Sequence, residues 1–268
     1  MPSSLVSEVP HLREKTGIIG KVARAAAIYR VDDIYIYHDR PDESKLIRLV
    51  LCYLETPQYL RKRLFRVRPE LRYVGTLPPL RTPHHPLENE TDKLEKGEFR
   101  EGVVLSEECD GFLVDIGVDK PLLARGKAPS IGSRTTVQVI GIKPILVGRF
   151  ASRREIDLYW GYDVHIANGD LGRLVQRDFD LTIATSRHAA PYTQLDSQLR
   201  TSWKLASNIL VAFGSPRKGV GDVLAKEKLN INEVFHYVVN MIPHQGCETV
   251  RTEEAIHAAL AIMNLLDS

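Results

Sequence analysis

The sequence has few cysteines and no long apolar run, and these absences exclude several classes of protein. Its 268 residues include three cysteines, Cys52, Cys109 and Cys247, which lie far apart and form no CxxC pair. This spacing indicates neither a disulfide framework nor a zinc site, and it favours a reducing compartment. No apolar run reaches about 18 residues and no signal peptide is visible. We therefore predict a cytoplasmic protein without a membrane span or a metal.

Common nucleotide-binding and hydrolase motifs are also missing. The stretch GSPRKG, Gly214–Gly219, has the glycine spacing of a P-loop, but Val220 and Gly221 follow where that motif needs Lys and Ser or Thr. No GxGxxG follows the first strand-like run, and neither GxSxG nor HExxH occurs. These absences argue against a P-loop NTPase, a nicotinamide-binding domain, a serine hydrolase with a nucleophile elbow and an HExxH metalloprotease.

Charge is nearly balanced along the chain, but it is not evenly distributed. There are 36 Lys and Arg against 34 Asp and Glu, and the resulting net charge of +2 alone is weak evidence for nucleic-acid binding. The segment 59–72, YLRKRLFRVRPELR, is rich in Lys and Arg and contains a single Glu, and shorter basic clusters lie at 147–155 and 215–219. Such clusters attract phosphate groups, although a solvated helix face is an equally good interpretation of each.

The two ends of the chain show α/β patterning. Residues 5–31 have an apolar stripe typical of a helix, 32–38 alternate as in a strand, and 45–65 predict a helix that breaks before Pro57. From about residue 156, continuous apolar runs alternate with predicted helices, which indicates a parallel sheet covered on both faces. The runs are 162–169, 179–187, 208–227 and 234–240, and a helix over 252–266 follows with Thr252 as its N-cap.

The middle of the chain has a different composition and hydrophobic pattern. Residues 76–92 are rich in proline and polar residues, as at a domain boundary. Short strand-like runs separated by glycine-containing turns come next, at 99–105, 111–118, 120–125 and 134–142. This spacing predicts a small OB-like β-barrel inserted into an α/β domain. We predict an α/β domain from 1–78 plus 150–268 and an inserted barrel over 79–149.

The C-terminal third resembles the SPOUT family of RNA methyltransferases, whose fold contains a trefoil knot. The stretches LTIATSRHA, LVAFGSPRKGVGDVL and VVNMIPHQGCETVRTEEAIHAALAIMNLL match, in order, the three loops with which that family binds S-adenosylmethionine. An archaeal and eukaryotic branch with an OB-like insertion is more similar still, through LREKTGIIGKVARAAAIYRVDDIYIY, YLETPQYLRKRLF, GTLPPLRTPHH and FREGVV. Related sequences carry a strand before SSLVSE, where only Met1 and Pro2 stand here, so we expect either one strand fewer or a natural start further upstream.

The resemblance implies a cofactor site built mostly from backbone groups. Arg24, on the helix before the first strand-like run, and Arg187 are the expected catalytic side chains, although each is equally well explained by a structural ion pair or loop clamp. The expected S-adenosylmethionine-binding residues are Thr185, Ser186, Arg187, Gly214, Ser215, Gly219, Asn240, Ile242, Pro243, Gln245, Gly246, Thr249 and Val250.

The resemblance also implies RNA as a partner and a homodimer in which each active site borrows residues from the other subunit. Ribosomal RNA, with a uridine N3 as the acceptor, is the leading substrate. Two alternatives stay open, namely a tRNA or 2′-O-ribose methyltransferase and a non-catalytic RNA- or ribonucleoprotein-binding protein. The expected RNA contacts are Arg61, Lys62, Arg63, Arg153, Arg154 and Lys218.

Overall fold

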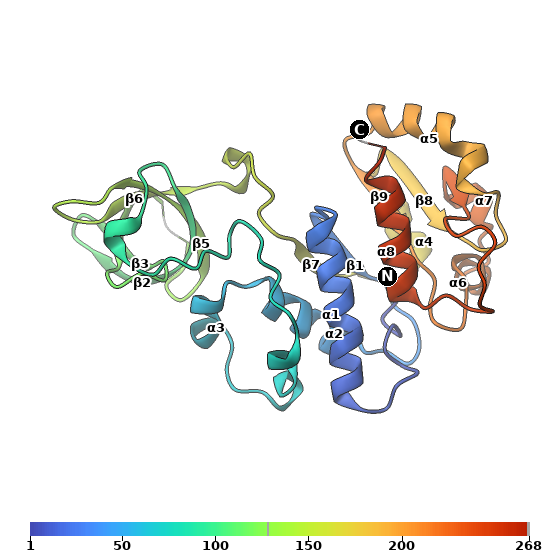
Figure 1. Cartoon of the computed structure of the whole chain (residues 1–268), viewed down its shortest axis with the longest axis horizontal. Coiled ribbons are helices and arrows are strands. Elements are labelled where there is room, and N and C mark those ends of the chain that lie inside the picture. Colours follow the sequence, from blue (N-terminus) through green and yellow to red (C-terminus); the bar gives the residue numbers. More distant parts are fainter. Residues whose placement is uncertain (128, 267–268) are drawn as a thin grey trace. The chain divides into compact units, whose positions relative to one another are not determined.

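The computed structural model describes residues 1–127 and 129–266, which divide into two compact units (Figure 1). The first unit combines Met1–Cys52, Tyr73–Leu77 and the residues from Tyr162 onward, and we call it the sheet unit. The second combines Tyr53–Arg72 and Pro78–Gly161, and we call it the barrel unit. Each unit is therefore assembled from segments that are distant in the sequence.

The sheet unit is a mixed α/β structure whose strands are all parallel, as the apolar runs predict. Strand β1 (Asp33–Ile36) pairs with β7 (Asp163–Ile166), and Pro2 forms an isolated parallel bridge with Tyr37 just after β1. A second sheet has the order β10-β8-β9, formed by Tyr237–Val239, Leu181–Thr185 and Ile209–Ala212. In β8 the residues from Leu181 to Ala184 are buried, as expected for a central parallel strand.

Helices accompany both sheets of this unit. Leu174, Leu210, Leu224 and Phe235 are among the buried residues that join helices to strands in one apolar core, and α1 packs against α8. The helices are α1 (Leu12–Ile28), α2 (Ser44–Glu55), α4 (Leu171–Val175), α5 (Tyr192–Leu205), α6 (Val220–Lys226), α7 (Ile231–Val234) and α8 (Thr252–Met263).

The start of the first predicted helix and the N-cap of the last one are wrong. Helix α1 begins at Leu12 rather than near residue 5, and His11 is its N-cap, accepting the Arg13 N–H through Nδ1 at 3.1 Å. The preceding residues form turns, because the Ser3 hydroxyl donates to the Asp39 carbonyl at 2.8 Å and thereby ties this segment to the chain after β1. Helix α8 does begin at Thr252, but its N-cap is Arg251.

The barrel unit contains a closed barrel of five strands in the order β2-β3-β4-β6-β5. Neighbouring strands pair antiparallel except β4 and β6, which are parallel. Val114, Leu122 and Val137 are fully buried in its core. The strands are β2 (Phe99–Glu108), β3 (Gly111–Asp115), β4 (Leu122–Arg125), β5 (Arg134–Gly141) and β6 (Val147–Ala151). Strand β6 was noticed in the sequence only as a basic cluster, because Arg149 and its neighbours obscure its short alternating pattern.

Helix α3 (Gln58–Leu64) lies against the barrel, after the predicted break at Pro57. Its Tyr59 hydroxyl donates to the Glu101 carbonyl of β2 at 2.9 Å. A Cβ at Gly117, which has a φ of +80°, would come within 2.4 Å of the Tyr59 ring. The close approach between helix and barrel therefore requires glycine at this position.

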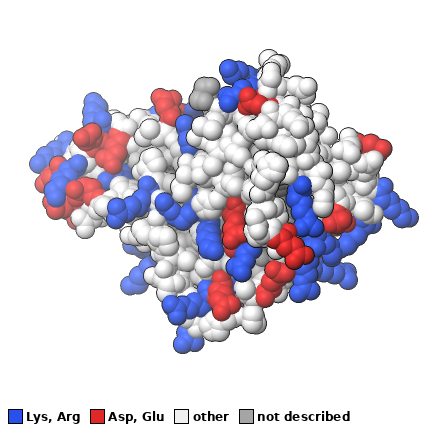
Figure 2. All heavy atoms as spheres, turned by 45° about the vertical axis from the view of Figure 1, so that its right-hand side comes forward, with Lys and Arg blue, Asp and Glu red and all other residues white. Residues whose placement is uncertain are grey.

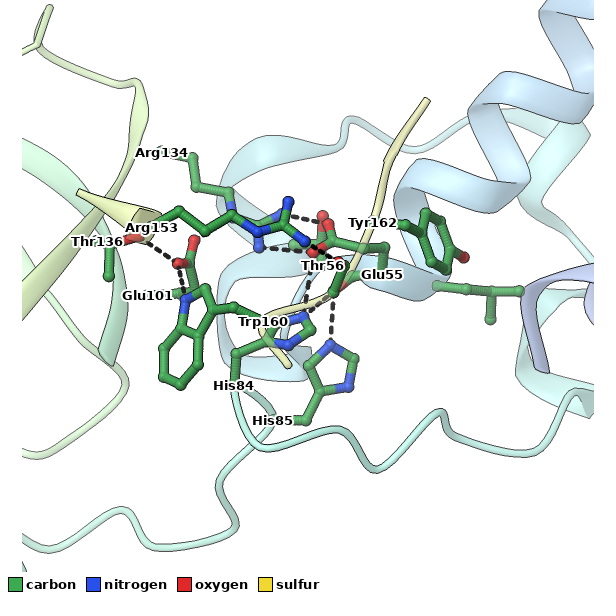
Figure 3. A network of polar contacts seen from close by, with 12 residues as sticks. Glu55, Thr56, His84, His85, Glu101, Arg134, Thr136, Arg153, Trp160 and Tyr162 are labelled. Atoms are coloured by element: carbon green, nitrogen blue, oxygen red, sulfur yellow. Dashed lines mark hydrogen bonds and ion pairs between the residues drawn. The ribbon is translucent and has the colours of Figure 1, made fainter. Parts of the chain in front are cut away.

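A buried polar network joins the end of α2 to the barrel strands inside this unit (Figure 3). Arg134 of β5 donates from Nη2 to Glu55 Oε1 at 3.0 Å and also bonds to Glu101. Trp160 Nε1 and the Thr136 hydroxyl each donate to Glu101 Oε1 at 2.6 Å. Paired charges with additional hydrogen bonds are the form in which ionised groups are tolerated inside a protein.

Two adjacent histidines complete this network. The Nε2 atoms of His84 and His85 lie 2.9 and 2.6 Å from the Glu55 carbonyl oxygen. Burial acts to raise the pKa of the Glu55 carboxyl, but hydrogen bonds from His84 and Arg134 outweigh it and lower the pKa to about 2. Burial, together with the neighbouring His84, lowers the pKa of His85 to about 4. The network is therefore built for an ionised Glu55 and a neutral His85.

We expect the barrel unit to lose stability as the pH falls from about 6.5 to about 4. In this window the unfolded chain protonates His85 while the folded chain does not, so the free energy of unfolding falls by up to about 1.4 kcal/mol per pH unit. Urea unfolding of the wild type and of His85→Gln across this pH range measures the effect. The variant should give a flatter profile, and equal slopes for the two proteins would contradict the prediction.

Candidate functional site

A pocket opens at the carboxyl ends of β8, β9 and β10, where the chain leaves each strand. Ligands of open parallel sheets bind in this position because loops and free backbone groups converge there. The lining residues come from the loops that follow the three strands and from the start of α8. They are Thr185–His188, Phe213–Gly219, Asp222, Asn240–Ile242, Gln245, Thr249, Val250, Thr252 and Ala255.

The structure brings most of the predicted cofactor-binding residues together at this pocket. Pro243 and Gly246 are the two that do not line it, although they belong to the same loop as Ile242 and Thr249. The residues that do line it are Thr185, Ser186, Arg187, Gly214, Ser215, Gly219, Asn240, Ile242, Gln245, Thr249 and Val250. Residues spread over some 65 positions of the sequence thus share one site.

Some lining residues were not predicted from the sequence. Asp222 stands three residues after Gly219 and accepts the Gly219 N–H through Oδ2 at 2.9 Å, a helix-start spacing that can be recognised in a sequence. Phe213 and Met241 follow directly after apolar strands, so nothing in the sequence separates them from core residues. Thr252 was taken for an N-cap, yet its hydroxyl donates to the Gly214 carbonyl at 3.1 Å and ties α8 to the loop after β9.

Arg187, in the loop after β8, links two of the three loops. Its Nη1 donates to the Glu248 carbonyl at 2.7 Å, and its own carbonyl accepts the Asn240 side-chain amide at 3.0 Å. Its Nε–H points to His188 Nε2 at 3.1 Å. The guanidinium therefore holds the loop after β10 against the loop after β8 at the edge of the pocket.

The loop after β9 makes a tight turn that leaves no room for a side chain at Gly214. Ser215 and Lys218 exchange backbone hydrogen bonds of 2.8 and 3.3 Å across the turn. A Cβ on Gly214 would lie 2.6 Å from the Lys218 carbonyl oxygen and 3.0 Å from the Gly219 Cα. Because both contacts are with backbone, only a glycine fits without moving the turn.

A buried tyrosine supports the start of this turn. The Tyr37 hydroxyl donates to the Phe213 carbonyl at 2.8 Å. Burial, with a smaller effect of Asp39, raises the pKa of Tyr37 far above its usual range. The hydroxyl therefore stays protonated and remains a donor at every pH at which the protein is folded.

The loop after β10 offers unused backbone donors. Asn240 Oδ1 accepts the Ile242 N–H at 3.0 Å, and Gln245 Nε2 donates to the Cys247 and Glu248 carbonyls at 2.9 and 3.1 Å. Side chains thus satisfy several groups of the loop. In the described part of the chain, however, none of the backbone N–H groups of 246–250 donates a hydrogen bond. These N–H groups are available to the polar edge of a ligand.

The edge of the pocket carries positive charge. Arg217 and Lys218 line it, and Arg217 has one weak ion pair, 3.4 Å from Glu8. Lys218 lies so close to Lys226 of α6 that it lowers the pKa of Lys226. Figure 2 shows Lys and Arg side chains gathered on part of the surface, with acidic side chains among them. Two cations held side by side favour a negatively charged ligand nearby.

The remaining predicted residues lie elsewhere. Arg24 is on α1 and is not among the described residues that line the pocket. Arg153 donates to the Gly161 carbonyl inside the barrel unit, whereas Arg154 is exposed. Within residues 1–127 and 129–266, no cluster of three or more His, Cys, Asp or Glu fits a metal ion. No helix in the same residues is long and apolar enough to cross a membrane.

Comparisons with known proteins show an RNA methyltransferase family and relatives that match nearly the whole chain. A family model described as "Putative RNA methyltransferase" matches residues 1–263. An uncharacterized protein of Haloarcula marismortui is 35% identical, covering 100% of this chain and 98% of its own length. The 28S rRNA (uridine-N(3))-methyltransferases of Mus musculus and Homo sapiens are each 30% identical over 98% of this chain, and cover 74% and 76% of their own lengths.

Proposed function

The chain belongs to the "Putative RNA methyltransferase" family, and from this premise we propose that its pocket binds S-adenosylmethionine and that it methylates N3 of a uridine in ribosomal RNA. As an RNA methyltransferase, the enzyme needs a methyl donor and an RNA acceptor. The relatives named 28S rRNA (uridine-N(3))-methyltransferases support this choice of RNA and atom, because their similarity extends over nearly the whole chain.

One observation carries the proposal for the donor. The three loops that follow β8, β9 and β10 meet at a single pocket, and each contributes residues to its lining. Parallel sheets bind nucleotide-like ligands at this end of their strands. The site for an adenosine-containing donor is therefore expected where the three loops converge.

The residues present fit the chemistry of S-adenosylmethionine. The unused N–H groups of 246–250 suit the hydrogen-bonding edge of an adenine, and Ile242 and Val250 offer apolar contacts to its faces. The tight turn at Gly214 brings backbone close to the pocket, as a ribose requires. The Asp222 carboxylate is available to hydroxyl or ammonium groups of the ligand.

When bound, S-adenosylmethionine supplies a methyl group on a positively charged sulfur. In the transfer, N3 of the uridine forms a bond to the methyl carbon, the carbon–sulfur bond breaks with its electron pair left on sulfur, and the N3 proton departs. The chain must hold donor and acceptor in line and provide a route for the proton. Asp222 and His188 are the lining side chains that can accept a proton, and His188 Nε2 already accepts from Arg187.

We also propose the knotted SPOUT fold, with a homodimer as the working form and a small OB-type barrel inserted into the α/β domain. The parallel order β10-β8-β9 and the long loop between β10 and α8 support the knot. The barrel order β2-β3-β4-β6-β5, closed by the parallel pair β4–β6, supports an OB-type insertion. Because Arg24 does not line the pocket of its own chain, we place Arg24 of the partner subunit at the RNA.

Calorimetry and mass spectrometry test the proposal together. We expect S-adenosylmethionine to bind the purified protein, and ribosomal RNA from a deletion strain to lack one 3-methyluridine that the purified enzyme restores. Arg24→Ala should leave donor binding unchanged and lower methylation at least tenfold, as for the loss of one charged contact. No measurable donor binding would refute the enzyme mechanism, and a missing modification in transfer RNA instead would refute the ribosomal substrate.

A further inference from the structure

The basic segment of the barrel unit, defined here as residues 61–68 (RKRLFRVR), contains cations of two kinds. Arg61 donates from Nε to the Thr56 carbonyl at 2.8 Å and from Nη2 to the Leu54 carbonyl at 3.0 Å. Arg63 forms an ion pair with Asp115 of β3. These two arginines therefore hold the segment to its own unit.

The other three cations of the segment face solvent. Lys62, Arg66 and Arg68 are exposed, and none of their side chains makes a hydrogen bond or an ion pair with any residue that the structure describes. Phe65 and Arg68 have extended backbone conformations, and Val67 between Arg66 and Arg68 is fully exposed. Side chains alternate direction in extended chain, so solvent reaches both sides of this stretch.

The segment is nevertheless anchored. Leu60 of α3 is fully buried, and the Tyr59 hydroxyl is bonded to the Glu101 carbonyl of the barrel. The Arg63 ion pair adds a second link, from α3 to β3. The three cationic side chains without partners are thus carried by an anchored segment. Less conformational entropy of the backbone is therefore lost when they bind a ligand.

We propose that Lys62, Arg66 and Arg68 bind the phosphate backbone of single-stranded RNA. The inference rests on the proposed function, which supplies RNA as the substrate. Phe65, the aromatic residue of the segment, packs edge-on against Tyr53 with a centroid separation of 5.2 Å, so it is already engaged inside the unit. We therefore expect the contact with RNA to be electrostatic rather than base stacking, and its strength to be independent of the RNA sequence.

Electrostatic binding of this kind has a measurable salt dependence. Each phosphate contact on single-stranded nucleic acid adds about 0.7 to the slope of log K against log salt concentration. The triple variant Lys62→Ala/Arg66→Ala/Arg68→Ala should lower the slope by about 2 and weaken binding on the order of 100-fold at about 0.1 M salt. The measurement is fluorescence anisotropy of fluorescein-labelled oligouridylate with the full-length protein, titrated at several KCl concentrations.

A matched control removes three positive charges from exposed positions outside the basic segment. Lys45, Lys96 and Arg125 are exposed, and their side chains, like those of the three test residues, form no hydrogen bond or ion pair with the described residues. Their triple alanine variant should keep the wild-type slope. Equal slopes for the wild type and the Lys62 triple variant would overturn the inference, as would an anionic peptide that competes with the wild type's RNA binding more strongly than unlabelled RNA does. If the wild type binds S-adenosylmethionine but no RNA, the proposed function fails as well.

Discussion

Gly214→Ala should weaken S-adenosylmethionine binding at least about tenfold and slow methyl transfer by roughly 100-fold. The added Cβ would lie 2.6 Å from the Lys218 carbonyl and 3.0 Å from the Gly219 Cα, so the turn after β9 has to shift. A misplacement of about 1 Å in a site that aligns two reactants costs on the order of 100-fold in rate. Calorimetry with the donor and a single-turnover assay with radiolabelled methyl groups measure the two effects.

Gly246→Ala is the matched control, because nothing lies within 4 Å of a Cβ at Gly246. Both variants add one methyl group to a glycine of the loops around the pocket and keep its backbone N–H, but Gly246 does not line the pocket and only Gly214→Ala meets backbone atoms. Thermal unfolding of both proteins separates a local change in the turn from a general loss of folding. Wild-type donor affinity in a folded Gly214→Ala variant would show that the turn does not shape the donor site.

The second large effect is expected in the barrel unit. Glu55→Ala should lower the free energy of unfolding of this unit by about 3–5 kcal/mol, because it leaves Arg134 and His84 without the buried carboxylate. Trp160, which donates to Glu101 in the same network, reports on this transition by fluorescence. The sequence contains two tryptophans, so a Trp203→Phe background leaves Trp160 as the single probe.

Two variants make this test specific. Arg63→Ala removes an ion pair whose arginine side chain is 52% exposed, and it should cost less than about 1 kcal/mol. Glu55→Gln keeps a side-chain oxygen that can accept from Arg134 and leaves the ion pair between Arg134 and Glu101 in place, so it should recover part of the loss seen in Glu55→Ala. If Glu55→Ala is no more destabilising than Arg63→Ala, the network contributes no more than a surface ion pair.

The sequence predicted the parallel sheet because buried parallel strands are continuous apolar runs, a property that is local to each segment. It predicted the three loops of the pocket for a related reason, since loops at the carboxyl ends of such strands converge. The individual lining residues were expected from the resemblance to a known family. The helical pattern was predicted from residue 5, whereas α1 begins at Leu12. The hydrogen bond from Ser3 to Asp39 that ties the preceding residues to the chain after β1 is a tertiary contact. Strand β6 was missed because Arg149 obscures its short alternating pattern, and its parallel pairing with β4 is a contact that only folding creates.

The basic residues also show which properties can be predicted from the sequence and which depend on the tertiary structure. Their clustering is visible in the sequence, but Arg61, Arg63 and Arg153 look no different there from Lys62, Arg66 and Arg68. Only the folded chain places backbone carbonyls or a carboxylate beside the first three. By itself, the sequence determined the family, the parallel strands and the loops of the site, because these depend on local pattern. The tertiary structure decided which glycine lacks room for a Cβ, which carboxylate is buried among cations and which cations remain free, because each depends on atoms that folding brings together from distant segments.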